Sequence, residues 1–346
     1  MKTRNNLIVK NELVKTNDED WNKLKLFIKE VEKTFGKGSV ILDDKNKKFS
    51  IETISTGSIL LNKILGIGGY PKGRIVEIYG PESSGKTTFC LQAIAEVQKT
   101  FKNAAFIDAE HAFNLEYAKK IGVNEKKLVI VRPQYGEQAF DILEVLLKSK
   151  KFDLIVIDSV SALIPKKELE SDINDQFIGN QAKLMSKALR KLVGLISNSN
   201  CLVIFINQLR EKIGVFFGNP ETTSGGRALK FYSSLRLDLR KIESVKDKNN
   251  NFIGANIRVR IVKNKLAPPL ETAVIRINFN NGIDQFFEIL NLALKLNLIV
   301  RKGTYYYEGN TNKKIAQGKE QLLIFLKKNN KYFENLKKII ISKLKV

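Results

Sequence analysis

The residues that decide the fold are Gly80-Pro81-Glu82-Ser83-Ser84-Gly85-Lys86-Thr87-Thr88. A strand-like run at residues 74–79 precedes them, and a helix-like run at residues 89–98 follows. The spacing G-x-x-x-x-G-K-T between a strand and a helix is typical of a phosphate-binding P-loop. Its glycines let successive backbone N–H groups face one anion, and the helix adds its positive end. A chance glycine turn would lack the Lys-Thr pair, so the sequence predicts a nucleoside triphosphate site.

Two side chains of the loop and one strand end predict a metal ion beside the phosphates. Lys86 can reach the outer phosphates, and Thr87 can hold Mg²⁺ through its hydroxyl group. The apolar run at residues 154–157 ends in Asp158, the pattern of the carboxylate that orients a water molecule on that ion. We therefore expect Thr87 and Asp158 on the metal side of the site.

Two further strand ends carry polar residues at the edge where ligands of open α/β sheets bind. Residues 104–107 lead into Asp108 and Glu110, and residues 204–206 lead into Asn207 and Gln208. We favour Glu110 as the general base because it lies further past its strand. The alternative, that both carboxylates cap a helix or are solvated, stays open. Gln208 could contact the γ-phosphate and couple hydrolysis to the long loop after it.

Composition favours a polyanionic partner and excludes several classes of protein. The net charge of +23 and pI near 9.8 suit nucleic acid, although richness in Lys, Asn and Ile can also arise from nucleotide composition. The two cysteines, Cys90 and Cys201, and the single histidine, His111, predict neither a disulfide framework nor a zinc site. No apolar run approaches the ~20 residues of a membrane span, and no signal-peptide pattern opens the chain, so we expect a cytoplasmic protein without a membrane partner.

The chain divides into four segments by pattern. Residues 1–19 show no periodicity and are expected to be partly disordered. Residues 20–54 contain an amphipathic helix at 21–35 that Gly36 can end, and it could pack on its own core or dock on a neighbouring subunit. Residues 55–284 alternate apolar strands with helices, which predicts a mostly parallel sheet buried on both faces. Residues 285–346 read as a small α+β domain.

Within the core segment, residues 235–242 and 257–262 alternate apolar with basic residues. Such alternation predicts half-exposed strands, and the polar stretch at 246–251 predicts the turn between them. The sequence therefore predicts a hairpin with one solvated, basic face.

Longer stretches resemble the bacterial RecA recombinase family over roughly residues 20–330. Besides the P-loop, these are residues 106–112 (FIDAEHA), 204–208 (IFINQ), 212–215 (KIGV), 217–223 (FGNPETT), 225–232 (GGRALKFY) and 262–265 (VKNK). The resemblance implies a RecA-like fold, with a P-loop NTPase core, an N-terminal docking arm and a small α+β C-terminal domain. It implies a DNA-dependent ATPase that forms filaments on single-stranded DNA, pairs it with homologous duplex and exchanges strands.

The resemblance also implies roles for single residues around ATP and Mg²⁺. All nine P-loop residues would contact ATP, Glu110 would polarise the attacking water, and Asp158 would be the metal-side carboxylate. Gln208 would signal the ATP state to the DNA loops, while Asn114 and Tyr117 would lie at the adenine. Lys263 and Lys265 would reach the ATP of an adjacent subunit, so the active site would be complete only in a helical homopolymer.

For DNA, the resemblance implies a first loop at residues 170–179 and a second at 209–226. The expected primary contacts are Ile178, Lys183, Ser186, Arg190, Arg210, Lys212, Ile213, Gly225, Gly226 and Arg227. The expected site for the second DNA is the basic hairpin face, with Arg240, Lys241, Arg258 and Arg260. Three positions depart from the family pattern: Asn114 replaces an Asp, Phe177 lies in a divergent first loop, and Arg227 adds a cation.

Two other functions stay open. A ring-forming, helicase-like motor could use the same core, but it would lack the N-terminal docking helix and the two lysines of residues 262–265. A nucleotide-gated DNA-filament scaffold could instead stimulate the self-cleavage of a LexA-type repressor with little strand exchange. Glu110 argues against a pure scaffold, and relatives often combine both activities.

Overall fold

The computed structural model describes residues 18–36, 40, 51–172, 175, 177, 179–211, 218, 220–309, 311 and 313–344. The chain divides into two units, Met1–Ser50 and Ile51–Val346. The expectation of disorder at residues 1–19 lies outside the described residues, except for Asp18 and Glu19, which begin a helix.

The described part of the first unit is helix α1 (Asp18–Phe35), which the sequence predicts from residue 21. Gly36 has a φ of +95° and donates its N–H to Glu32 O at 2.9 Å, so it ends the helix as expected. Leu24, Phe27 and Phe35 on its apolar stripe are exposed. The predicted helix is therefore confirmed in type and position.

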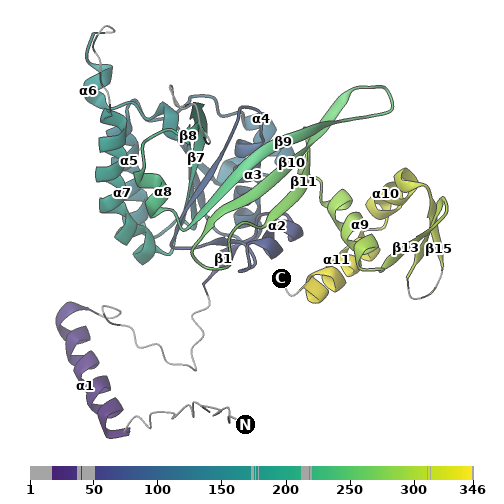
Figure 1. Cartoon of the computed structure of the whole chain (residues 1–346), viewed down its shortest axis with the longest axis horizontal. Helices are drawn as coiled ribbons and strands as arrows, with labels where there is room; N and C mark the ends of the chain where they lie inside the picture. Colours follow the sequence, from purple (N-terminus) through teal and green to yellow (C-terminus); the bar gives the residue numbers. More distant parts are fainter. Residues whose placement is uncertain are drawn as a thin grey trace, which may run out of the picture. The chain divides into compact units, whose positions relative to one another are not determined.

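The second unit is built on a ten-stranded sheet whose central strands run parallel (Figure 1). Its strands in spatial order are β12 (Gly282–Ile283), β11 (Thr272–Asn278), β10 (Phe252–Asn264), β9 (Leu235–Lys246), β3 (Ile75–Gly80), β7 (Leu202–Glu211), β6 (Leu154–Asp158), β4 (Ala104–Asp108) and β5 (Leu128–Val131), with β8 (Glu221–Thr223) beside β7. A separate pair is β1 (Thr53–Ile54) with β2 (Tyr70–Pro71). Every residue of β3, β4 and β6 is buried, which explains their continuous apolar runs.

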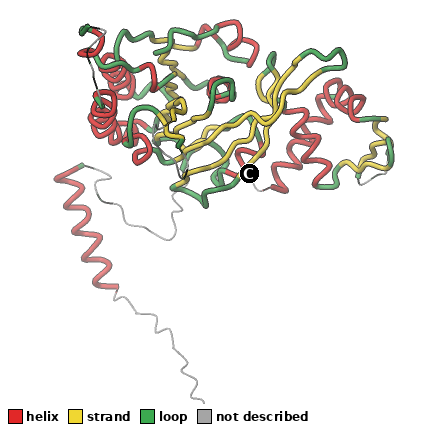
Figure 2. Tube along the Cα trace, turned by 45° about the horizontal axis from the view of Figure 1, so that its top comes forward, coloured by secondary structure: helices red, strands yellow, loops and turns green. Residues whose placement is uncertain are grey.

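Helices cover both faces of this sheet, as Figure 2 shows. The helices of one face are α2 (Ile59–Ile64), α3 (Lys86–Lys99) and α4 (Leu115–Ile121). Those of the other face are α5 (Gly136–Ser149), α7 (Asn180–Ser199) and α8 (Ala228–Tyr232). Short connecting helices are η1 (Glu125–Lys127), η2 (Val160–Ala162) and α6 (Lys166–Leu169). This is the mostly parallel α/β core that the sequence predicts. Among the described residues, no helix is both long and apolar enough to cross a membrane.

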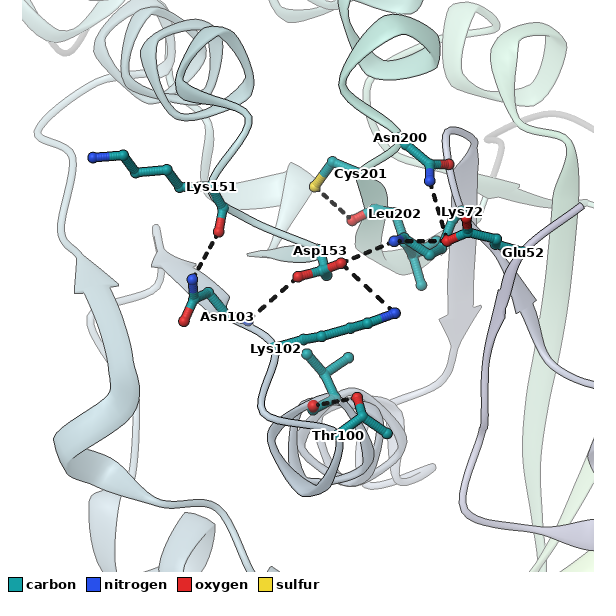
Figure 3. A network of polar contacts seen from close by, with 11 residues as sticks. Glu52, Lys72, Thr100, Lys102, Asn103, Lys151, Asp153, Asn200, Cys201 and Leu202 are labelled. Carbon is teal, nitrogen blue, oxygen red and sulfur yellow. Dashed lines mark hydrogen bonds and ion pairs between the residues drawn. The ribbon is translucent and has the colours of Figure 1, made fainter.

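A polar network around Lys72 lies at the amino ends of the parallel strands, as Figure 3 shows. The side chain of Lys72 is only 6% exposed and binds Glu52 at 3.1 Å and Asp153 at 2.8 Å. Burial alone would lower the pKa of Lys72, but the hydrogen bonds to the two carboxylates raise it overall. Asp153 precedes β6 and Lys72 precedes β3, so the network ties these strands together at the edge opposite the P-loop.

The C-terminal part folds around a hydrophobic cluster of its own, to which α2 adds Ile59. It consists of α9 (Gln285–Lys295), β13 (Ile299–Lys302), β14 (Tyr305–Glu308), β15 (Lys314–Gln317), α10 (Lys319–Lys328) and α11 (Asn330–Leu344). Glu288 of α9 accepts hydrogen bonds from Ser58 Oγ, from Ile59 N at 3.0 Å and from Leu60 N at 3.1 Å. This partly buried carboxylate therefore links the C-terminal part to the start of α2.

Candidate nucleotide and DNA site

The P-loop joins the carboxyl end of β3 to the first residue of α3. Gly85 precedes the helix with a φ of +86°, a conformation that favours glycine. A Cβ atom at Gly80 would lie 2.2 Å from Leu239 O on the neighbouring strand, so no side chain fits there. Both glycines of the motif are therefore required by backbone geometry, and the curled loop fits a phosphate chain.

Lys86 is held inside this loop by carbonyl groups. Its Nζ donates to Gly80 O at 3.2 Å and to Pro81 O at 2.7 Å. Burial lowers the pKa of Lys86, while nearby Asp158 and Glu110 act in the opposite direction. A partly buried ammonium group with neutral hydrogen-bond partners fits an anionic ligand such as the outer phosphates of ATP.

Thr87 and Asp158 meet where α3 begins and β6 ends. The Thr87 hydroxyl donates to Asp158 Oδ2 at 2.8 Å. Burial raises the pKa of Asp158 to about 6, against a lowering by the Thr87 hydrogen bond. Hydroxyl and carboxylate oxygens are ligands that Mg²⁺ prefers, so these two residues fit the ion. In the described part of the chain no group of three His, Cys, Asp or Glu could hold a metal alone, so the phosphates and water would complete its coordination.

The two carboxylates after β4 lie in different surroundings. Asp108 is buried and accepts hydrogen bonds from Ala112 N at 3.0 Å and Phe113 N at 3.2 Å. Both residues come before α4, whose cap is Asn114, so Asp108 holds the loop before this helix in place and is neither a helix cap nor solvated, the two alternatives that the sequence left open. Glu110 instead accepts a hydrogen bond from Ser159 Oγ and one from Gln208 Nε2 at 2.9 Å.

The structure thus brings together three strand ends at Glu110. Glu110 follows β4, Ser159 follows β6, and Gln208 belongs to β7. Ala109 N and Glu110 N also donate to Asp158 O, at 2.8 and 3.2 Å, which fixes the chain beside the metal-side carboxylate. Sequence reasoning missed Ser159, although its position directly after Asp158 is a signal that could have identified it.

The residues expected near adenine border the same loop. Tyr117 on α4 has its hydroxyl 2.8 Å from Thr88 Oγ1 on α3. Asn114 caps α4, and its Oδ1 accepts from Tyr117 N at 2.9 Å. The structure therefore places Tyr117 next to the last residue of the P-loop, with Asn114 holding the start of its helix.

The two loops that are expected to contact DNA meet at the start of α7. A Cβ atom at Gly225 would lie 2.8 Å from Val160 Cγ1, and one at Gly226 would lie 2.7 Å from Ala182 Cβ. A cleft of about 370 Å³ runs here, lined by Phe177 and Gly179 of the first loop and by both glycines of the second.

Of the expected primary DNA contacts, Lys183 and Arg190 on α7 and Arg227 before α8 are exposed, and Ser186 is partly buried. Ile178, Lys212 and Ile213 lie outside the described residues.

Part of the second loop forms a ribbon. Strand β7 continues past Ile206 to Glu211 and pairs antiparallel with β8, with Leu209 opposite Thr223 and Glu211 opposite Glu221. The paired residues are ten to fourteen positions apart, and nothing in their polar composition predicts this pairing. Arg210 is exposed on this ribbon, in register with Thr222.

The predicted basic hairpin is present as β9 and β10, joined by the turn at residues 247–251 (Figure 1). Lys241, Arg258 and Arg260 are exposed. Arg240 is different, because its guanidinium group binds Glu221 through two hydrogen bonds of 2.7 and 2.6 Å and Asp238 through another of 2.7 Å. These carboxylates raise the pKa of Arg240 and neutralise part of the face that the sequence predicts to be basic.

Lys263 and Lys265 lie far from the P-loop of their own chain. Lys263 Nζ donates to Lys230 O at 2.6 Å, and Lys265 Nζ donates to Phe231 O at 3.2 Å, both at the end of α8. Lys265 N bonds Ser234 O, and Ser234 N bonds Ile75 O, at the amino end of β3. Gly80 ends the same strand roughly 17 Å away at ~3.3 Å per residue. The structure therefore does not bring these lysines to the P-loop within one chain.

Comparisons with known proteins agree with this geometry. The family model of the RecA N-terminal domain matches residues 22–284, and that of the RecA C-terminal domain matches residues 287–345. The chain is 53% identical to Protein RecA of Mycoplasma mycoides subsp. mycoides SC over 329 residues, covering 93% of this chain and 94% of the relative. It is 53% identical to Protein RecA of Phytoplasma mali over 320 residues, covering 92% and 94% of the two chains.

A solved structure described as the RadB recombinase is similar in fold. The similarity has a TM-score of 0.51 at 24% sequence identity, and it covers 67% of this chain and 98% of the other.

Proposed function

Because the chain belongs to the RecA family of ATP-dependent DNA recombinases, we propose that it forms filaments on single-stranded DNA, pairs the bound strand with homologous duplex and exchanges the strands. ATP with Mg²⁺ is the cofactor, and hydrolysis turns the filament over. Homology is read by base pairing, which is consistent with loops that carry cations, glycines and hydroxyl groups.

One contact carries this proposal: the hydrogen bond from Gln208 to Glu110. Glu110 is the general base for the water that attacks the γ-phosphate, with Ser159 holding its carboxylate in place. Gln208 begins the last part of β7, which continues into the second DNA loop. A change in the position of Gln208 on ATP binding is therefore transmitted to residues that meet DNA.

The remaining ATP contacts divide between two subunits. Lys86 holds the outer phosphates, Thr87 and Asp158 hold Mg²⁺, and Tyr117 stacks on adenine. Lys263 and Lys265, at the opposite end of β3, act on the ATP of the neighbouring subunit. Such a head-to-tail contact does not close on itself and generates a helical filament.

The DNA contacts divide between a primary and a second site. Exposed residues on α7, on the ribbon of β7 and β8 and at Arg227 bind the phosphates of the first strand, which makes binding strongly salt-dependent. Arg258 and Arg260 on the solvated face of the hairpin bind the second DNA.

The test is ATP hydrolysis by the purified protein with and without homopolymeric single-stranded DNA, followed by a strand-exchange assay. We expect strong stimulation of hydrolysis by DNA that is lost in both Lys86→Ala and Glu110→Gln, and strand exchange by the wild type. DNA binding without stimulated hydrolysis or strand exchange would instead support the nucleotide-gated scaffold and overturn the proposal.

A further inference from the structure

Asn207, the residue before Gln208, is fully buried on β7, and both ends of its amide group are used. Its Nδ2 donates to Glu77 Oε1 at 3.0 Å and to the backbone carbonyl of Ser224 at 3.0 Å. Its Oδ1 accepts from Gln208 N at 2.9 Å. A single side chain therefore joins β3, the second DNA loop and the backbone of Gln208.

Asn207 and Gln208 point to opposite faces of the sheet, because successive side chains of a strand alternate. The preceding residues show which face is which: Ile206 packs in the cluster that contains α3, and Phe205 packs in the cluster that contains α7. Gln208 therefore lies on the face of the P-loop helix, where it meets Glu110. Asn207 lies on the face of α7, against which Gly225 and Gly226 pack.

The anchor of this connection is a buried ion pair. Glu77 on β3 is fully buried, and its second carboxylate oxygen binds Arg236 on β9. The guanidinium group of Arg236 also lies over the Tyr79 ring, 4.7 Å from its centroid. A buried polar group with all its partners in place holds one geometry, since any displacement leaves a donor or acceptor unpaired at a cost of about 1–3 kcal/mol.

Resting on the function proposed above, we propose that Asn207 is a positioning residue that ties the ATP-sensing residue Gln208 to Ser224 in the second DNA loop, with the Glu77–Arg236 pair as its fixed anchor. When Gln208 moves on ATP binding, its N–H turns the Asn207 amide about the hydrogen bond from Nδ2 to the fixed Glu77 carboxylate. Ser224 then follows through its carbonyl, and the adjoining Gly225 and Gly226 are shifted against α7. Without Asn207, Gln208 would reach the loop only through the pairing of β7 with β8 and through the bond from Ser224 N to Gln208 O, which is long at 3.4 Å, and neither would hold the Ser224 carbonyl in place.

The test is the ratio of two dissociation constants for single-stranded DNA, measured with ADP and with a slowly hydrolysed ATP analogue. In the wild type we expect this ratio to be about tenfold or more, within the usual range of coupling between two sites. Asn207→Ala is expected to bring the ratio to within about twofold of one, with ATP-analogue binding retained. The matched control is Asn62→Ala, since Asn62 is 8% exposed, and its amide binds Thr56 and Ser55 away from the DNA loops. This control loses stability but keeps the wild-type ratio.

A second variant keeps the test decisive if Asn207→Ala does not fold. In Asn207→Asp combined with Glu77→Gln, the side-chain hydrogen bond between β7 and β3 can form with donor and acceptor exchanged, but Ser224 O loses its donor. We expect the ratio of dissociation constants of this double variant to fall to near one. A wild-type ratio in either Asn207 variant would overturn the inference.

The variant Gln208→Ala separates this inference from the proposed function. If Gln208→Ala retains the wild-type ratio of dissociation constants, the coupling in the proposed function fails. If Gln208→Ala loses that ratio while Asn207→Ala retains it, only the role of Asn207 is rejected.

Discussion

The Thr87 hydroxyl donates to Asp158 Oδ2 at 2.8 Å, so the two residues expected to share Mg²⁺ bind each other directly. Burial raises the pKa of Asp158 to about 6 from an ordinary value of 3.8, although the Thr87 hydrogen bond and the nearby Lys86 ammonium group act in the opposite direction. Burying the charged Asp158 carboxylate therefore lowers the free energy of unfolding, and a bound cation would restore it.

Asp158→Asn should therefore stabilise the protein without nucleotide at mildly alkaline pH. A raised folded-state pKa means that the contribution of Asp158 to stability is present below the unfolded value of 3.8 and is lost as pH rises through about 6. At about pH 8 we expect the variant to gain roughly 2–3 kcal/mol in the free energy of unfolding, and the two proteins to converge near pH 4. Urea unfolding across this range measures the difference, and equal stabilities at the alkaline end would contradict the burial argument.

Glu110→Gln and Asp108→Asn should separate chemistry from stability. Glu110→Gln is expected to lower the rate of DNA-stimulated ATP hydrolysis by about 10²–10⁴-fold while ATP still binds, because the general base is lost. Asp108 is buried and bonded to backbone N–H groups, so Asp108→Asn should mainly lower the free energy of unfolding, by about 1–3 kcal/mol. Single-turnover hydrolysis and urea unfolding of both variants make the comparison. A larger loss of rate in Asp108→Asn would show that the general base was assigned to the wrong carboxylate.

Two inactive variants should restore each other when mixed. Lys86→Ala destroys the P-loop half of a site, and Lys263→Ala combined with Lys265→Ala destroys the half supplied by the neighbour. In an equimolar mixture we expect roughly a quarter of the wild-type ATPase rate, since random assembly joins two intact halves at one interface in four. Each variant alone is the control. No recovery in filaments that contain both chains would mean that the lysines act within their own subunit.

Glu221→Gln should strengthen binding of the second DNA. It leaves Arg240 with Asp238 as its only carboxylate partner among the residues that the structure describes, so the guanidinium group becomes available to a phosphate. We measure duplex capture by preformed filaments as a function of salt and plot the logarithm of the binding constant against the logarithm of the salt concentration. Glu221→Gln should steepen this slope by about one ion per site, and Arg258→Ala should make it shallower by about the same amount. An unchanged slope in Glu221→Gln would show that Arg240 does not meet DNA.

The network around Lys72 makes a prediction about stability alone. Asp153→Ala removes the closer carboxylate from a nearly buried ammonium group, and we expect a loss of roughly 2–4 kcal/mol in the free energy of unfolding. Lys72→Met replaces the charge with an apolar side chain of similar length and should cost less than about 1 kcal/mol or stabilise the protein. Urea unfolding at neutral pH compares the two. A larger loss in Lys72→Met than in Asp153→Ala would show that the ion pairs give net stabilisation.

Much of the core could be predicted because its signals are local. The apolar runs at β3 to β7 correspond to strands, the P-loop lies between β3 and α3, and Gly36 ends α1. The alternation in β9 and β10 likewise predicts one solvated face.

What could not be predicted depends on contacts between distant segments. The sequence favours Glu110 over Asp108 as general base only by its position further past the strand, because the contacts that separate the two, Ala112 on one side and Gln208 on the other, have no local signal. The sequence also predicts Arg240 to be an available cation. Its partner Glu221 is positioned by the pairing of β8 with β7, and no local sequence pattern predicts that pairing. The burial of Lys72 between two carboxylates is equally invisible in a chain with so many exposed lysines.

The position of the two lysines at the amino end of β3, with the P-loop at its carboxyl end, gives the proposed filament a direction. One terminal subunit would display a P-loop that no neighbour completes, and the other would display Lys263 and Lys265 without a phosphate to bind. A newcomer at the first end would cover ATP already bound to the filament, whereas a newcomer at the other end would bring its own ATP to the waiting lysines, so growth and shrinkage would proceed at different rates at the two tips. A polymer of identical chains would in this way have a leading and a trailing end.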